Sequence, residues 1–226
     1  MKVIVTGATG LAGGGVVKQC LQDDRIDSLI ILTRKHLSAD VESNPKVQVI
    51  MHQDFSTYPD ELMQKLQGAD ACIWCIGGRV DQFGNDKELC RRVGVDFTLA
   101  AAKAMSTHLA APSSSGREFR FVYCSGKYAE WDQDKTLLFL GDTRRFKGLA
   151  EKGLRELAEA TPGFEVWVLR PSGILSTEAP LYRRVVGKLY EAIDTAQLGR
   201  ALVRVAVEGC EDKMLENDAL HRMAAA

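Results

Sequence analysis

Short apolar runs and longer amphipathic stretches alternate along most of the chain. Six runs rich in valine and isoleucine are nearly continuous in apolar character, and they predict strands at 2–6, 29–33, 47–52, 71–76, 119–124 and 166–170. The segments between them carry apolar residues at helical spacing, and they predict helices at 11–21, 60–66, 87–109 and 144–160. Strands buried on both faces and alternating with helices form a parallel sheet with right-handed crossovers. The pattern therefore predicts an α/β fold with a doubly wound parallel sheet.

The connecting segments and the end of the chain depart from this pattern. Residues 111–116 have the composition of a loop, and the polar run 132–135 lies between a strand and a helix, where site-forming loops are usually found. After Pro171 the chain turns mostly helical, and the apolar run 198–207 predicts a core-facing helix. We expect a single domain spanning all 226 residues, in which 171–226 form a small helical lobe for the substrate beside the carboxyl ends of the strands.

Composition narrows the class of protein. The chain has 29 basic and 30 acidic residues and a net charge of −1, which argues against binding to nucleic acid or to an acidic membrane surface. It contains no apolar run long enough for a signal sequence or a transmembrane helix. Six cysteines without a dense framework fit a reducing compartment, so we expect a cytoplasmic protein.

The most informative motif is the glycine-rich run TGATGLAG at 6–13, which lies directly between the first strand and the first helix. One glycine makes a tight turn, one lets the backbone approach a pyrophosphate, and one allows close packing of helix and strand. The free N–H groups and the dipole at the helix N-terminus then favour an anion. This arrangement predicts a dinucleotide-binding Rossmann domain whose pyrophosphate is held by Gly7, Thr9, Gly10, Leu11 and Gly13.

The end of the second strand indicates which dinucleotide is bound. An NAD site normally places Asp or Glu there to hold the ribose 2′-hydroxyl, but this chain has Arg34, which suits the 2′-phosphate of NADP(H). Lys35 is a second cation that either helps or points to solvent. Asp54 and Phe55 follow the third strand, where we expect a contact with the adenine or a turn cap, and Gly77 follows the fourth, where the backbone can pass over the adenosine.

Motifs along nearly the whole chain resemble the short-chain dehydrogenase/reductase superfamily, in its atypical branch. They are the glycine motif, the VGVD segment at 93–96, a strand ending in Ser125, Lys147 on the next helix, and the RPSG segment at 170–173. The stretch MLENDALH at 214–221 is similar to the end of the HIV Tat-interactive protein group within that branch.

The resemblance implies a catalytic serine and a Tyr-x-x-x-Lys pair, in which the tyrosine exchanges a proton with the substrate oxygen and the lysine holds the nicotinamide ribose. By position these roles fall to Ser125 and Lys147, with backbone at Pro171 contacting the nicotinamide carboxamide. The tyrosine position holds Thr143, whose hydroxyl is far less acidic than a phenol. Two alternatives for the missing acid are Tyr128, on the loop after the fifth strand, and Lys147 itself with a pKa lowered by desolvation.

The C-x-x-C motif at 72–75 does not predict a metal site. Residues three apart in a strand point to opposite faces, and the chain has no second pair and only four histidines. We therefore expect free cysteines here and no bound metal.

The expected function is an NADP(H)-dependent oxidoreductase that lacks the usual catalytic tyrosine and acts on a carbonyl or enone of a small, apolar metabolite. An isomerase, dehydratase or cyclase on the same scaffold is one alternative, and a catalytically silent NADP(H)-sensing regulatory protein is another. The amphipathic helices are compatible with a homodimer.

Overall fold

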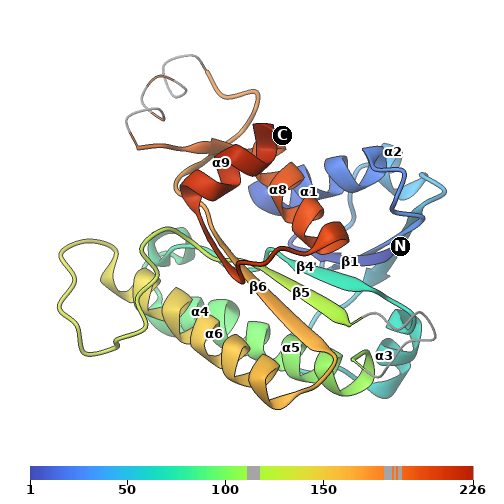
Figure 1. Cartoon of the computed structure of the whole chain (residues 1–226), viewed down its shortest axis with the longest axis horizontal. Helices are drawn as coiled ribbons and strands as arrows, with labels where there is room; N and C mark the ends of the chain where they lie inside the picture. The colour runs from blue at the N-terminus through green and yellow to red at the C-terminus, as the bar shows by residue number, and fades with distance from the viewer. Residues whose placement is uncertain (111–117, 181–184, 186, 188–189, 226) are drawn as a thin grey trace.

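The computed structural model describes residues 1–110, 118–180, 185, 187 and 190–225, and it is built around a seven-stranded parallel sheet (Figure 1). Its strands in spatial order are β3 (Val47–Met51), β2 (Ser28–Thr33), β1 (Lys2–Thr6), β4 (Ala71–Trp74), β5 (Phe119–Cys124), β6 (Phe164–Arg170) and β9 (Met214–Glu216). The order reverses between β1 and β4, which is the doubly wound arrangement. The fold class and the six expected strands are confirmed.

Helices cover both faces of this sheet. They are α1 (Leu11–Gln22), α2 (Ala39–Glu42), α3 (Asp60–Leu66), α4 (Lys87–Arg91), α5 (Phe97–His108), α6 (Gly141–Ala160), α8 (Thr195–Glu208) and α9 (Asn217–Ala225). The helix expected at 87–109 is divided, because a π-helical turn at Arg92–Asp96 separates α4 from α5. In the described part of the chain, no helix has both the length and the apolar character needed to span a bilayer.

Each face of the sheet has its own apolar core. Side chains on alternate strand positions pack against α3, α5 and α6 on one face, and against α1, α8 and α9 on the other (Figure 1). Alternation places Cys72 in the first core and Cys75 against the second, as the sequence predicts. Glycines let α1 and α8 approach closely: a Cβ on Gly15 would lie 2.3 Å from the carbonyl oxygen of Thr195.

The segment expected as a helical lobe is partly sheet. Beyond Pro171, β7 (Ile174–Leu175) pairs with β8 (Ile193–Asp194) in a separate two-stranded sheet, and β9 becomes the seventh strand of the main sheet. The expectation of a mostly helical end was therefore wrong for these strands, because two or three residues are too few to show a strand period. The core-facing helix expected at 198–207 is confirmed as α8, and the loop expected at 111–116 lies outside the described residues.

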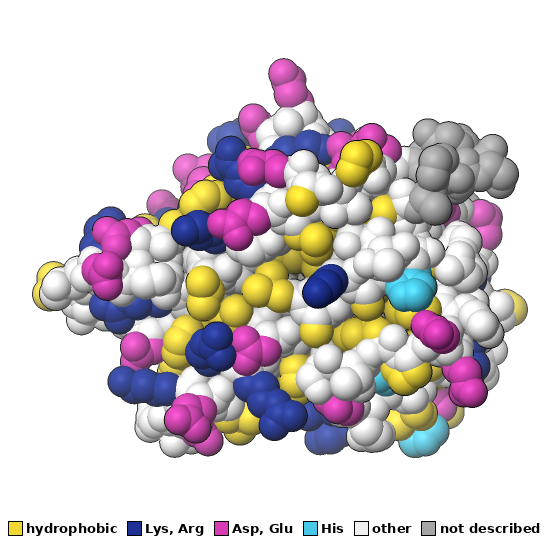
Figure 2. Space-filling model, turned by 90° about the horizontal axis from the view of Figure 1, so that it is seen from below, with side chains coloured by type: hydrophobic (Ala, Val, Ile, Leu, Met, Phe, Trp, Pro, Cys, Tyr) yellow, Lys and Arg dark blue, Asp and Glu magenta, His cyan; other side chains and the backbone are white. Residues whose placement is uncertain are grey.

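The surface carries charges of both signs. Figure 2 shows Lys and Arg side chains interspersed with Asp and Glu, around hydrophobic side chains gathered near the middle of this face. The described part of this face therefore offers no extended single-sign patch of the kind that binds a polyanion.

Candidate functional site

The glycine-rich loop forms a tight cradle between β1 and α1. Gly7 has a left-handed φ of +67°, and a Cβ there would lie 2.5 Å from the carbonyl oxygen of Cys75. A Cβ on Gly13 would lie only 2.2 Å from the carbonyl oxygen of Gly7, so both positions require glycine. Gly10 caps α1 without a side-chain hydrogen bond, which leaves the first N–H groups of the helix available to an anion.

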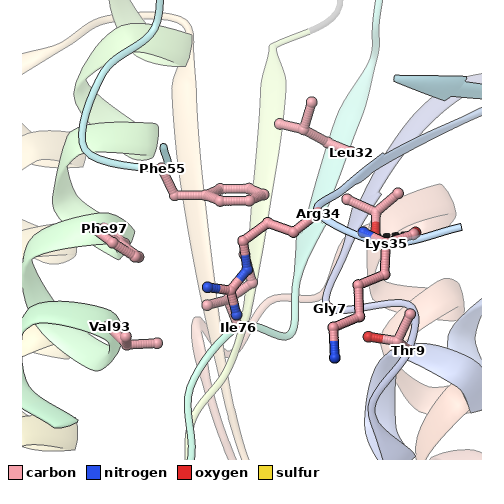
Figure 3. Close-up of a pocket in the computed structure, with 10 residues that line it drawn as sticks. Gly7, Thr9, Leu32, Arg34, Lys35, Phe55, Ile76, Val93 and Phe97 are labelled. Atoms are coloured by element: carbon pink, nitrogen blue, oxygen red, sulfur yellow. Dashed lines mark hydrogen bonds between the residues drawn. The ribbon is translucent and has the colours of Figure 1, made fainter. Parts of the chain in front are cut away.

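A pocket opens beside this loop at the carboxyl ends of β1 and β2 (Figure 3). The residues that line it are Gly7, Thr9, Leu32, Thr33, Arg34, Lys35, Phe55, Ile76, Val93 and Phe97. Figure 3 shows Arg34 reaching into the pocket toward Ile76, and Lys35 lying beside Gly7 and Thr9. Two cations and no carboxylate stand among these lining residues, so the pocket suits phosphate groups.

Apolar side chains form the far wall of the pocket. Phe55, Val93 and Phe97 face Arg34 across the cavity and offer a surface on which a flat base can pack (Figure 3). Of the two residues expected at the adenine, Phe55 lines the pocket and Asp54 does not. Its carboxylate accepts hydrogen bonds from the backbone N and the hydroxyl of Ser56, at 3.0 and 2.6 Å, and these bonds lower its pKa. Asp54 is thus a turn cap, and its neighbour Phe55 reaches the pocket.

Lys147, on α6, is absent from the pocket lining and lies beside Gly77, just after β4. Its Nζ is 3.2 Å from the place where a Cβ on Gly77 would stand, and it donates a hydrogen bond to the carbonyl oxygen of Cys124 at 3.3 Å. Burial by itself would lower the pKa of Lys147, but Tyr123, Cys124 and Glu151 outweigh it, and the net shift is upward. This direction is opposite to the lowered pKa that was one alternative for the missing acid, and it favours a charged Lys147.

Ser125, just past β5, is held by a buried carboxylate. Its hydroxyl donates a hydrogen bond to Oε1 of Glu151 at 2.5 Å, and Glu151 is fully buried. The same carboxylate accepts a hydrogen bond from Trp131 Nε1 at 2.7 Å and two from Arg170, at 2.5 and 3.0 Å. Because the hydroxyl has only one proton, Ser125 in this arrangement can accept a hydrogen bond from a substrate but cannot donate one.

Glu151 was not among the residues predicted from the sequence. The available signal was its position one turn after Lys147 on the same helical face, with Arg170 at the end of the neighbouring strand. A carboxylate in a helix is usually exposed, and the ion pair with Arg170 together with the hydrogen bonds from Ser125 and Trp131 compensates its burial.

Thr143, at the position of the missing tyrosine, has a structural role. Its hydroxyl oxygen accepts a hydrogen bond from the backbone N of Val80 at 3.0 Å, at the start of the 3₁₀ turn Val80–Phe83. The tyrosine position of the resembled superfamily is thereby used to fix the loop that follows β4.

The remaining candidate residues are absent from the pocket lining. Tyr128 has a left-handed φ of +67° and is half-exposed, and its ring packs edge-on against Phe139 beside the guanidinium of Arg144. The buried Pro171 uses its carbonyl to accept a hydrogen bond from the backbone N of Lys127 at 2.7 Å. Leu11, in the first turn of α1, is exposed and is absent from the pocket lining.

Comparison with solved structures supports the same fold. The chain is similar to DesIV, a dTDP-glucose 4,6-dehydratase from Streptomyces venezuelae solved with NAD, with a TM-score of 0.72 and 17% identity over 99% of this chain and 80% of that one. It is similar to Gre2 from Candida albicans in complex with NADPH, with a TM-score of 0.71 and 17% identity over 96% of this chain and 77% of that one. A short-chain dehydrogenase/reductase from Saccharomyces cerevisiae gives a TM-score of 0.72 and 13% identity, with 99% of each chain covered.

Sequence comparison identifies a curated relative and a family. The leucinostatins biosynthesis cluster protein T of Purpureocillium lilacinum is 35% identical over 125 residues, which are 55% of this chain and 42% of that protein. The match thus spans less than half of the relative's length. A family described as NAD(P)H-binding matches residues 7–208, which include the glycine cradle, the pocket at the end of β2 and Lys147. The chain therefore belongs to this NAD(P)H-binding family.

Proposed function

We propose that the protein is an NADP(H)-dependent oxidoreductase of the atypical short-chain type, acting on a carbonyl or enone of a small, apolar metabolite. The observation that carries the choice of cofactor is the pair Arg34 and Lys35 at the end of β2, in a pocket whose lining holds no carboxylate. A carboxylate there would repel a 2′-phosphate, whereas these cations attract it. The similarity of residues 214–221 to the HIV Tat-interactive protein group supports a place in that branch.

The chain's own residues would divide the work between the two ends of the cleft. The N–H groups at the start of α1 bind the pyrophosphate, Arg34 binds the 2′-phosphate, and the apolar wall packs against the adenine. The charged Lys147 donates hydrogen bonds to the ribose hydroxyls beside Gly77. When bound, NADPH supplies the hydride for reduction.

The proton donor is the open part of this mechanism. The hydroxyl of Ser125 donates its hydrogen bond to Glu151, so in this arrangement it can accept a hydrogen bond from an alcohol but has no proton left for a carbonyl oxygen. Tyr128 is the phenol on the loop after β5, and its ring must leave Phe139 and Arg144 to enter the cleft. We propose Tyr128 as the acid, with Lys147 holding the cofactor.

A second candidate function is an NADP(H)-sensing regulatory protein without turnover. The observation in its favour is that Thr143 and Ser125 both have their hydroxyls engaged in intramolecular hydrogen bonds. The cradle would then bind cofactor, and the bound state would alter a surface for a protein partner. An isomerase, dehydratase or cyclase on the same scaffold differs in converting its substrate without net change of the nicotinamide.

The first test is calorimetric titration with NADPH and NADH. We expect NADPH to bind at least about tenfold more tightly, and Arg34→Ala to remove most of that ratio while leaving NADH affinity unchanged. Lys18→Ala is the matched control, because Lys18 is an exposed cation of α1 outside the pocket lining. Equal affinity for the two nucleotides, or tighter binding of NADH, would contradict the proposal.

The second test is turnover. NADPH oxidation in the presence of a panel of apolar aldehydes, ketones and enones supports the oxidoreductase, and we expect Tyr128→Phe to lower it. Conversion of a substrate without nicotinamide oxidation would contradict the oxidoreductase proposal and favour non-redox chemistry. Cofactor binding that changes affinity for a protein partner, with no conversion, would favour the regulatory protein.

The cysteines bear on the cellular location of the protein. The six cysteines are free thiols, which suits a reducing compartment, and we propose a cytoplasmic location. We also propose a homodimer that binds a small-molecule substrate and no nucleic acid or membrane.

A further inference from the structure

Two cysteines stand side by side beneath the glycine cradle. Strands β4 and β5 pair in parallel, and their last paired residues are Trp74 and Tyr123. The next residue on each strand is a cysteine, so Cys75 and Cys124 continue the same register. Both side chains belong to the core beneath α1 and α8. Neighbouring strands lie about 4.8 Å apart, which falls within the Cα separation of about 4.4–6.8 Å that a disulfide spans.

The surroundings of this pair differ from those of the other buried thiols. A hydrogen bond between the two thiols lowers the pKa of Cys124 and raises that of Cys75, and the Lys147 ammonium favours both thiolates. By contrast, burial raises the pKa of Cys20 to about 12. Cys75 is partly exposed whereas Cys124 is buried, so a small oxidant would have to reach Cys124 past Cys75.

We propose that Cys75 and Cys124 form a reversible disulfide when the protein meets hydrogen peroxide. The Cys124 thiolate attacks one peroxide oxygen, and the O–O bond breaks. Hydroxide departs as the leaving group, and Cys124 becomes a sulfenic acid. The Cys75 thiol then attacks this sulfur, the S–O bond breaks, and water leaves as the S–S bond forms. In sum, two thiols and one hydrogen peroxide give one disulfide and two waters.

The backbone of Cys75 contacts the glycine cradle. The backbone N of Cys75 donates a hydrogen bond to the Thr6 hydroxyl at 3.2 Å, and its carbonyl oxygen is the atom that a Cβ on Gly7 would strike. A disulfide fixes Cys75 to Cys124 and so constrains the backbone that packs against Gly7. We therefore expect oxidation to weaken NADPH binding by about tenfold, a consequence that rests on the proposed cofactor, whereas the disulfide itself does not.

The test is a thiol inventory by alkylation and peptide mass spectrometry before and after peroxide, on the folded full chain. We expect the loss of two alkylated sites, a linked peptide pair containing Cys75 and Cys124, and full recovery with a dithiol reductant. In Cys75→Ser, the sulfenic acid stays on Cys124 and is trapped by dimedone. Circular dichroism of the oxidised protein verifies that the fold is retained.

Two controls make the outcome decisive. Cys90→Ser should leave the linkage unchanged, although Cys90 is the other cysteine near Lys147, because its thiol bonds to the carbonyl oxygen of Gly78. Cys72→Ser, on the opposite face of the sheet, should also have no effect. Six free thiols after treatment, or a linkage through Cys90 or Cys72, would overturn the proposal. If the untreated protein did not bind NADPH, the proposed cofactor would be contradicted, but the disulfide proposal would not be affected.

Discussion

The two ends of the proposed cofactor site, the adenosine end at β2 and the nicotinamide end at Lys147, use their polar groups in opposite ways. At the adenosine end, the N–H groups of α1 and the cations Arg34 and Lys35 face an open pocket. At the nicotinamide end, Ser125 donates to Glu151, and Thr143 accepts a hydrogen bond from the backbone of Val80. One end is prepared for a ligand, whereas the polar groups of the other are engaged with the protein. The difference shows that a retained fold can keep its cofactor site while the residues next to the chemistry take structural roles.

The largest expected effect concerns the buried carboxylate of the nicotinamide end. Glu151→Leu leaves Arg170, only 13% exposed, without its buried partner, and we expect the free energy of unfolding to fall by about 3–5 kcal/mol. Urea denaturation measures the change. Glu159→Leu on the same helix is the control, because its pair with Arg155 is exposed and should be worth less than about 1 kcal/mol. A similar loss in the free energy of unfolding in the two variants would mean that the buried ion pair of Glu151 contributes no more to stability than the exposed pair of Glu159.

The next effect concerns the cradle of the adenosine end. Gly13→Ala would place a Cβ 2.2 Å from the carbonyl oxygen of Gly7, so the loop must shift, and we expect NADPH affinity to fall about 100-fold. Gly14→Ala is the matched control, since its Cβ would meet Ala8 at 3.4 Å, an ordinary contact. Calorimetry compares the NADPH affinity of the two variants. Unchanged affinity in Gly13→Ala would show that the cradle does not bind NADPH.

A smaller effect separates structure from chemistry at Thr143. Thr143→Val removes the acceptor for the backbone N of Val80, so we expect a loss of stability of about 1 kcal/mol with unchanged NADPH affinity. Thr143→Ser keeps the hydroxyl and should retain the stability. A fall in cofactor affinity without loss of stability in Thr143→Val would show instead that this hydroxyl serves the ligand.

The smallest effect is a pH dependence at the adenosine end. His52 packs against Phe55, and burial lowers its pKa below the ordinary value of 6.5. The unfolded chain then binds the proton more readily, so this contribution to stability is present above about pH 6.5 and is lost as the pH falls. Urea denaturation at about pH 7.5 and 5.5 should show a smaller difference for His52→Gln than for the unsubstituted protein. An equal difference in both proteins would assign the pH dependence to other groups.

Local patterns in the sequence predicted the sheet and the cradle. The strands carry continuous apolar runs, and the glycines at 7, 10 and 13 act through backbone geometry at the same short stretch of chain. The strand β9 was missed because it has three residues, too few for a period. The sequence placed Asp54 and Phe55 together near the adenine and left a turn cap open, because no local pattern encodes which of the two side chains faces the pocket.

The engagement of the nicotinamide end depends on residues distant along the chain. Ser125 meets Glu151 26 positions later, and Val80 meets Thr143 63 positions later. Spacing within a motif gives the position of a serine or a lysine, but it does not reveal which partner its side chain prefers. Those partners become visible only when the strands and helices are assembled.

The contact between α1 and α8 affects how the protein folds during its synthesis. The cradle precedes α8 in the chain by most of the sheet, yet α1 packs through Gly15 against Thr195 and Gly199 of α8. A nascent chain therefore carries its phosphate loop with one side of α1 uncovered until α8 has left the ribosome. The helix that supports the loop is covered only after the strands between them have been made.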